Sequence, residues 1–370
     1  MKKLGFGLMR LPLTDPNDAE SIDIEQLCRM ADTFLERGFT YFDTAWMYCG
    51  YKSETALREA VVKRHPRDSF TVATKMPMSM ITTEEEQRRI FDEQLEKCGV
   101  DHFDYYLLHN LGVERFELAK KLHSFEFVLQ KKKEGKIGSI GFSYHDGAKL
   151  LDRILTEHPE IEFVQLQLNY LDWENESIQS RECYETALKH NKPVIVMEPV
   201  KGGTLASVPE AADKLFKERR PDMSASSWAV RYAASFDNVM VVLSGMSDME
   251  QLLDNTGYMR DFEPLSPDEQ NIVARAADII NEAVAVPCTA CGYCVEGCPK
   301  NIPIPLYFSL YNADKRALNK GFSTHGVYYA NEIRSNAKAS ACIECRKCES
   351  ICPQHIAIAD ELKKVAKAFE

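Results

Sequence analysis

The sequence predicts an α/β protein: a (β/α)8 or TIM barrel followed by a small, mainly α-helical domain. From residue 3 to about residue 260, eight short apolar runs alternate with amphipathic segments, and strands that alternate with helices form parallel sheets. Eight repeats favour a closed barrel over an open doubly wound sheet. The alternation then stops, and most of the 12 cysteines lie after residue 287. We therefore expect two domains, residues 1–286 and 287–370.

The eight expected strands are near-continuous hydrophobic runs, which suit parallel strands buried on both faces. They cover residues 3–9, 39–44, 69–75, 103–109, 137–143, 162–169, 193–198 and 238–244.

The segments between these runs are expected to be helices, and several end in glycine, as helices commonly do. Residues 119–135 form one such amphipathic segment. A further helix is expected at 264–284, with Ser266 as N-cap, Pro267 at the first helical position and Glu269 completing a capping box.

The composition excludes several classes of function. The chain has 370 residues, 45% of them hydrophobic, and a net charge of −11, so it can bury one large core and a smaller one. An acidic chain lacks the basic surface that nucleic acid or an anionic membrane would require. No apolar stretch reaches the ~18 residues of a membrane span. The stretch "GFGLMR" is no dinucleotide-binding loop, because Arg10 replaces the third glycine and no helix follows.

Polar side chains stand at the ends of three successive expected strands. Asp43 follows the second run, Lys75 the third and His109 the fourth, and Tyr48 lies in the loop just after Asp43. In a (β/α)8 barrel, the carboxyl ends of the strands form the rim that carries the chemistry. We therefore expect these four side chains to meet at one rim.

These four residue types together suit proton transfer to a carbonyl oxygen. A free tyrosine has a pKa near 10, and the Lys75 ammonium is expected to lower the pKa of Tyr48. Asp43 would keep Lys75 charged and fixed, and His109 would orient a substrate oxygen. Tyr48 could then protonate that oxygen while a hydride reaches the carbon. Singly, each residue has an ordinary explanation as a cap, a solvated lysine or a core histidine; together they predict catalysis.

With these residues, the chain resembles the aldo-keto reductases over residues 3–270. The resemblance lies in "GFTYFDTAWMY", "VATK", "DYYLLH", "GKIGSIGFS", "VQLQLNYLD" and "LSGMSDMEQLLDN". It implies a barrel that binds NADPH, or sometimes NADH, across its mouth and interconverts a carbonyl compound, an aldehyde or ketone, with an alcohol. It also implies that Asp43, Tyr48, Lys75 and His109 form the catalytic tetrad.

The resemblance further implies a set of cofactor contacts, formed by Asp43, Ser143, Gln165, Met197, Ser244, Gly245, Gln251 and Asn255. Ser143 and Gln165 would hold the nicotinamide carboxamide, and Asn255 the adenine. Many NADPH-using members carry Lys and Arg at the positions of Gly245 and Gln251. Losing both cations weakens recognition of the 2′-phosphate, so NADP(H) and NAD(H) both remain open, with the resemblance favouring NADP(H).

The C-terminal cysteines form two copies of C-x2-C-x2-C-x3-C-P, the pattern of two-cluster ferredoxins, in which the fourth cysteine of each run binds the other cluster. This predicts two [4Fe–4S] clusters, rather than the C-x2-C pairs of a zinc site. One cluster would take Cys288, Cys291, Cys294 and Cys352, and the other Cys342, Cys345, Cys348 and Cys298. The helix-like segments 306–320 and 326–340 indicate an α-helical ferredoxin-like domain. Thiolate clusters and the absence of a secretory signal predict a cytoplasmic protein.

Three functions remain open at this level. The first is a carbonyl and alcohol oxidoreductase with a small-molecule substrate, in which the iron–sulfur module transfers electrons or is structural. The second is an electron-transfer protein whose clusters exchange electrons with a redox protein partner while the barrel binds nucleotide. The third is a nucleotide-binding sensor with little turnover. The tetrad favours the first.

Overall fold

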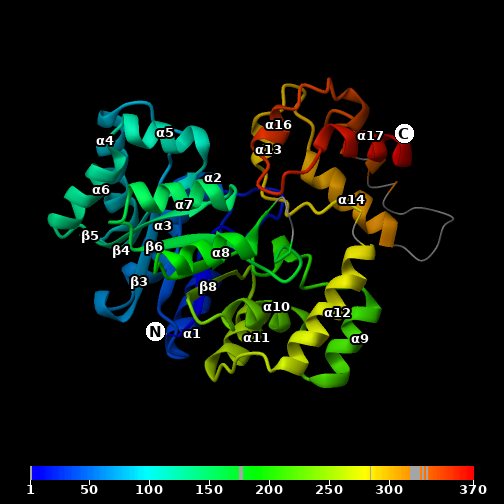
Figure 1. The fold of residues 1–370 in the computed structure, drawn as a ribbon, viewed down its shortest axis with the longest axis horizontal. Coiled ribbons are helices and arrows are strands. Elements are labelled where there is room, and N and C mark those ends of the chain that lie inside the picture. The colour runs from blue at the N-terminus through cyan, green and yellow to red at the C-terminus, as the bar shows by residue number, and fades with distance from the viewer. Residues whose placement is uncertain (1, 175–177, 284, 317–325, 327–328, 331) are drawn as a thin grey trace. The chain divides into compact units, whose positions relative to one another are not determined.

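The computed structural model describes residues 2–174, 178–283, 285–316, 326, 329–330 and 332–370 (Figure 1). The expected helical segments 306–320 and 326–340 therefore lie partly outside the described residues. In the described part of the first, α14 (Ile304–Arg316) is helical, as expected.

Eight parallel strands close into a barrel in the order of the sequence. They are β1 (Leu4–Gly7), β2 (Tyr41–Asp43), β3 (Thr71–Met76), β4 (Phe103–Leu111), β5 (Ile137–Tyr144), β6 (Phe163–Gln167), β7 (Val194–Met197) and β8 (Val239–Gly245). The barrel closes because β8 pairs with β1, with Val242 opposite Leu4. All eight expected strands are confirmed, with small shifts at their ends.

Side chains fill the inside of the barrel, as is usual for this architecture. The packed interior consists of buried residues from six strands: Tyr41, Ala73, Leu107, Phe163, Ile195, Val241 and Leu243. Gly141 on β5 leaves room for the Phe163 ring, since an added Cβ would lie 2.6 Å from two of its ring carbons. Because apolar side chains fill the barrel interior, the polar residues Asp43, Lys75 and His109 lie at or near the ends of the strands.

Helices surround the strands of the barrel (Figure 1). They are α1 (Ile24–Glu36), α4 (Glu84–Cys98), α5 (Val113–Lys121), α6 (Ser124–Lys133), α7 (Ala148–Glu157), α8 (Ser180–Lys189), α10 (Ala225–Ala234) and α11 (Met249–Arg260), with the short α2 (Tyr48–Tyr51) and α3 (Ser53–Leu57) after β2. The ends of α4 follow known rules: Thr83 and Glu86 form a capping box, and Gly99 ends the helix at φ 70°.

The helix expected over residues 119–135 is confirmed only in part, from Ser124 onward. The structure has two helices there, α5 and α6, separated at His123, which adopts a left-handed backbone with φ 49°. A left-handed residue interrupts the helical hydrogen bonds. Ser124 then starts the new helix, and its hydroxyl donates to Gln87 Oε1 at 2.5 Å.

The chain divides into two compact units, of which the second contains Val200–Ala225 and Ser266–Glu370. Its helices are α9 (Glu210–Arg219), α12 (Pro267–Ala283), α13 (Tyr293–Glu296), α14, α16 (Lys347–Ser350) and α17 (Ile358–Phe369). The expected start of α12 is confirmed: the Ser266 N–H donates to Glu269 Oε2 at 3.0 Å, and the Glu269 N–H donates to Ser266 Oγ at 3.3 Å. The domain boundary expected near residue 286 stays a prediction.

The second unit has a small core of its own, in which cysteines from both runs are buried or packed among apolar side chains. Its largest members include Tyr307, Phe308, Tyr329 and Leu362. Among the described residues, no helix is both long and apolar enough to cross a membrane.

Gly141→Ala should destabilise the barrel, because the added Cβ would lie 2.7 Å from the backbone oxygen of Phe163 as well as against its ring. We expect a loss of about 1–3 kcal/mol, seen as a drop of a few degrees in the apparent Tm by circular dichroism. Gly257→Ala on α11 is the matched control, since nothing lies within 4 Å of its added Cβ; it should leave Tm unchanged or raise it. Equal Tm values for the two variants would contradict this packing.

Candidate active site and cysteine pockets

The four residues of the expected tetrad gather at one end of three neighbouring strands. Asp43 is the last residue of β2, Lys75 stands near the end of β3, and His109 near the end of β4. Tyr48 begins the short helix α2 in the loop after β2. The first three side chains are buried and Tyr48 is partly buried.

A buried ion pair joins two of these strand ends. Lys75 Nζ lies 2.5 Å from Asp43 Oδ1 and also donates to the backbone oxygen of Thr44 at 2.6 Å. Gln165 Nε2 donates to the other Asp43 oxygen at 3.4 Å. Burial raises the pKa of Asp43 and lowers the pKa of Lys75, and the attraction between the two charges opposes both shifts.

A second buried carboxylate, Glu54 on α3, is held next to the end of β3. The sequence alone did not indicate its role. Its Oε1 accepts hydrogen bonds from Thr74 Oγ1 at 2.7 Å and Gln94 Nε2 at 2.8 Å. Gln94 also donates to the Lys75 backbone oxygen at 3.0 Å. Glu54 therefore helps to fix the end of β3. It stands six residues after Tyr48 and three before the buried Leu57. This spacing places Glu54 and Leu57 on the same face of a helix, which was the available signal.

Tyr48 lies against both Lys75 and His109. The Lys75 ammonium is 4.9 Å from the centroid of the Tyr48 ring, and the His109 ring meets the Tyr48 ring edge-on, with centroids 6.0 Å apart. The expected lowering of the Tyr48 pKa is wrong for this structure. Burial, together with the negative charges of Asp43 and Glu198, raises the pKa of Tyr48 well above its usual value.

His109 is a buried, neutral imidazole. Burial and the nearby Lys75, His145 and Arg115 hold the pKa of His109 well below its usual value. Its Nδ1 has no hydrogen-bond partner within the described part of the chain. Buried polar atoms are normally paired, so this nitrogen is suited to a hydrogen bond with a bound molecule.

Two of the expected cofactor residues lie at the same end of the strands as the tetrad. Ser143, near the end of β5, accepts a hydrogen bond from the Asn110 N–H at 2.8 Å. Gln165 on β6 faces Asp43. Met197 is the partly exposed last residue of β7. Ser143 and Gln165 are buried polar groups, as a site for an amide would require.

The remaining expected cofactor residues gather where β8 meets α11. Asn255 Nδ2 donates to Ser244 Oγ at 2.6 Å. Gln251 is held within its own loop, because its Nε2 donates to Asp248 Oδ2 at 2.7 Å. Gly245 is exposed, and an added Cβ would lie 3.2 Å from the Cβ of Arg10.

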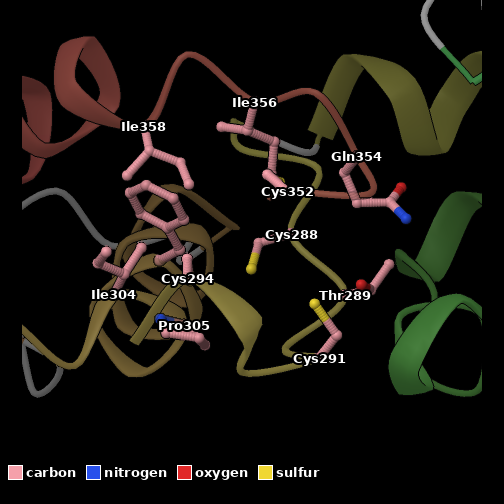
Figure 2. Close-up of a pocket in the computed structure, with 11 residues that line it drawn as sticks. Cys288, Thr289, Cys291, Cys294, Ile304, Pro305, Cys352, Gln354, Ile356 and Ile358 are labelled. Atoms are coloured by element: carbon pink, nitrogen blue, oxygen red, sulfur yellow. The ribbon is translucent and has the colours of Figure 1, made fainter. Parts of the chain in front are cut away.

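The eight C-terminal cysteines line two pockets. The first cysteine pocket, of about 300 Å³, is lined by Cys288, Cys291, Cys294 and Cys352, and Figure 2 shows the sulfur atoms of Cys288 and Cys291 pointing into the same space. The second cysteine pocket, of about 320 Å³, is lined by Cys298, Cys342, Cys345 and Cys348. Each pocket therefore draws three cysteines from one run and one from the other. The structure brings together the same sets that the sequence predicts, and ligation itself stays a prediction.

The two cysteine runs share a backbone conformation that suits a cluster. The residues on either side of the second cysteine are left-handed in both runs: Ala290 and Gly292 around Cys291, and Glu344 and Arg346 around Cys345. Among the described residues, no three His, Cys, Asp or Glu side chains could hold a single metal ion. The sulfurs instead surround a space, which fits a four-iron cluster with four thiolate ligands.

Burial raises the pKa of Cys288 and of Cys348 to about 11 each. The thiols are therefore protonated when no metal is bound, and the binding of iron would release their protons. The Ala290 N–H donates to the Cys288 sulfur at 3.4 Å, and such contacts stabilise a sulfur ligand that carries negative charge. The residues present thus fit iron–sulfur clusters.

Comparisons with known proteins agree with both parts of the chain. One relative, an aldo-keto reductase of Mycobacterium avium (strain 104), is 24% identical and matches 69% of this chain and 79% of its own length. Another, the L-galactose dehydrogenase of Arabidopsis thaliana, is also 24% identical and matches 64% of this chain and 78% of its own length.

Solved structures share the fold of the barrel. The holo form of the aldo-keto reductase AKR11C1 from Bacillus halodurans matches with a TM-score of 0.59 and 23% identity, over 74% of this chain and 91% of that one. An aldo-keto reductase from Klebsiella pneumoniae, solved in complex with NADPH, matches with a TM-score of 0.57 and 17% identity, over 74% of this chain and 90% of that one.

Family models account for most of the chain. Residues 287–357 match the 4Fe-4S dicluster domain, which agrees with the paired cysteine runs. Residues 3–278 match the aldo/keto reductase family. The protein therefore belongs to the aldo-keto reductase family of oxidoreductases and carries a 4Fe-4S dicluster domain after the barrel.

Proposed function

We propose that the protein is an NAD(P)H-dependent oxidoreductase that interconverts an aldehyde or ketone with the corresponding alcohol. The observation that carries this proposal is the meeting of the buried Asp43–Lys75 pair, the Tyr48 ring and the neutral His109 at one rim of the barrel. Family membership and the NADPH complex of a structural neighbour support it.

In this mechanism Tyr48 gives its hydroxyl proton to the carbonyl oxygen. The nicotinamide, when bound, supplies the hydride to the carbonyl carbon. Tyr48 is protonated at neutral pH, as a phenol is even at its usual pKa near 10. Its raised pKa makes the phenolate costly in the absence of substrate, and the Lys75 ammonium, 4.9 Å from the ring centroid, would stabilise the phenolate that remains after transfer. His109 orients the substrate oxygen through a ring N–H, which a neutral imidazole still has. In alcohol oxidation, Tyr48 takes the proton back.

For the cofactor, we propose a nicotinamide dinucleotide held by Ser143, Gln165, Ser244 and Asn255 with help from Asp43, Met197, Gly245 and Gln251. Ser143 and Gln165 are buried polar groups beside the tetrad, and in this proposal they hold the nicotinamide carboxamide. The loop at Gly245 and Gln251 presents no cation of its own, and Gln251 is bonded to the Asp248 carboxylate. NADH and NADPH are both compatible with this loop.

We also propose that the two cysteine pockets hold one [4Fe–4S] cluster each, with ligands Cys288, Cys291, Cys294 and Cys352 in the first, and Cys298, Cys342, Cys345 and Cys348 in the second. A dicluster domain is compatible with a redox protein as partner.

Tyr48→Phe should lower kcat for carbonyl reduction by about 10²–10⁴-fold, the usual contribution of a general acid. NADPH and NADH binding, followed by cofactor fluorescence, should change little, which separates loss of chemistry from loss of the site. Tyr51→Phe is the matched control, since Tyr51 lies in the same loop and is 46% exposed. A Tyr48→Phe rate within a few-fold of the wild type would contradict the assignment.

For the wild type, the raised pKa of Tyr48 predicts that the rate of carbonyl reduction does not fall from about pH 6 to about pH 9 through loss of the Tyr48 proton.

Gln251→Arg should raise the preference for NADPH over NADH, because it adds a cation where Asp248 is now bonded to a neutral amide. One charge-assisted hydrogen bond to the 2′-phosphate is worth ~1.5–3 kcal/mol, so the ratio of kcat/KM values should rise about tenfold or more. The neutral Gln251→Met variant controls for loss of the amide alone. An unchanged ratio in Gln251→Arg would place the phosphate elsewhere.

A further inference from the structure

A buried lysine is hydrogen-bonded to a residue that lines the first cysteine pocket. Lys201 belongs to the short helix η3 (Lys201–Gly203) and is 3% exposed. Its Nζ donates to Gln354 Oε1 at 3.0 Å. Gln354 follows Cys352 by two residues and lines the first cysteine pocket. Figure 2 shows it among the lining residues of this pocket.

The backbone around Lys201 is docked onto the cysteine loop. Gly202 adopts φ +63°, and an added Cβ would lie 2.2 Å from the backbone oxygen of Thr289. Thr289 lies between Cys288 and Cys291 and lines the same pocket. A contact this close admits only glycine. The segment that carries Lys201 is therefore fixed against the residues that surround the first pocket.

The Lys201 charge lies close to the expected cluster ligands. Its hydrogen-bond partner Gln354 follows Cys352 by two residues, and Thr289, against which Gly202 packs, directly follows Cys288. A cation that favours a negatively charged sulfur also favours a cluster that has gained an electron. In a buried setting this effect is screened little by solvent.

Among the described residues of the second unit, Lys201 is the only buried lysine or arginine, and the second cysteine pocket has no buried cation of this kind in its lining. Its two basic residues, Lys300 and Arg346, are both exposed. Arg346 is also paired with Glu349 at 3.0 Å and with Asp360 at 3.1 Å. Exposed, paired charges contribute little at a distance. The two pockets therefore differ in their electrostatic surroundings although their cysteine patterns are the same.

We propose that Lys201 tunes the redox chemistry of the domain: it raises the reduction potential of the cluster in the first cysteine pocket above that of the cluster in the second. An electron from a one-electron donor then resides preferentially at the first pocket. No proton or bond change accompanies this step; one cluster gains the electron and the donor loses it. Lys201 does not bind the cluster; its positive charge stabilises the reduced form from nearby. The inference rests on the cluster ligation proposed above.

The test is a potentiometric titration of the anaerobically purified full-length protein, with reduction of the clusters followed by electron paramagnetic resonance. Iron and sulfide are counted first; a wild-type protein without two clusters would refute the ligation proposal itself, before any question of tuning. In Lys201→Met, one of the two reduction steps should move to more negative potential, with about a tenfold lower ratio of reduced to oxidised cluster at a fixed potential, or ~59 mV for one electron.

Matched variants separate charge from structure. Lys201→Arg keeps the charge and should keep both steps near the wild-type values. Lys300→Met removes an exposed lysine at the second pocket and should move neither step appreciably. If both steps of a fully loaded Lys201→Met protein coincide with the wild type, or if Lys300→Met shifts a step as much, the proposal is overturned.

A further variant covers the case in which Lys201→Met does not assemble its clusters. Gln354→Met keeps the lysine but removes its hydrogen bond, so the ammonium is held less firmly at the pocket. One step should then shift in the same negative direction by a smaller amount. Two unchanged steps in Gln354→Met, with both clusters present, would equally overturn the proposal.

Discussion

The proposed catalytic site depends on one buried ion pair, Asp43 with Lys75. Two charges withdrawn from water are costly unless each is closely paired and hydrogen-bonded, and here the pair is 2.5 Å long with Thr44 and Gln165 as further partners. The register of β2 and β3 sets it up, because Asp43 lies opposite Ala73 and Lys75 is two residues further along on the same face. The ammonium held there lies over the Tyr48 ring, so the position of one charge determines the surroundings of the proposed acid.

The second unit uses a different organising element. Its core is small, and cysteines from both runs are packed into it, so iron–sulfur clusters would contribute to its folding as structural metals do. A hydride carries two electrons and a cluster accepts one, so the two chemistries do not exchange electrons directly without a group that can handle both. Residues 200–225, which follow β7 in the sequence, nevertheless belong to the second unit. Lys201 contacts Gln354, and Gly202 packs against Thr289.

The sequence predicts the architecture well because its signals are local. Near-continuous apolar runs identify all eight strands, and cysteine spacing groups the eight sulfurs as the two pockets do. The errors concern features that depend on tertiary structure. The left-handed residue His123 leaves no mark in the spacing of apolar residues over 119–135, so the sequence does not reveal the break between α5 and α6. The pKa of Tyr48 was predicted from its charged neighbour, whereas burial dominates. Glu54 was overlooked because its partners, Thr74 and Gln94, are distant in sequence.

The most direct test of the central claim is the protonation state of Lys75 in the folded protein. Nitrogen-15 labelling of the lysine side chains, with Lys75→Met for assignment, would identify its signal by nuclear magnetic resonance at about neutral pH. The ion pair predicts an ammonium signal protected from exchange with water, which shifts when Asp43 is replaced by asparagine. A neutral amine, or an ammonium that exchanges freely with solvent and does not respond to Asp43→Asn, would contradict the account.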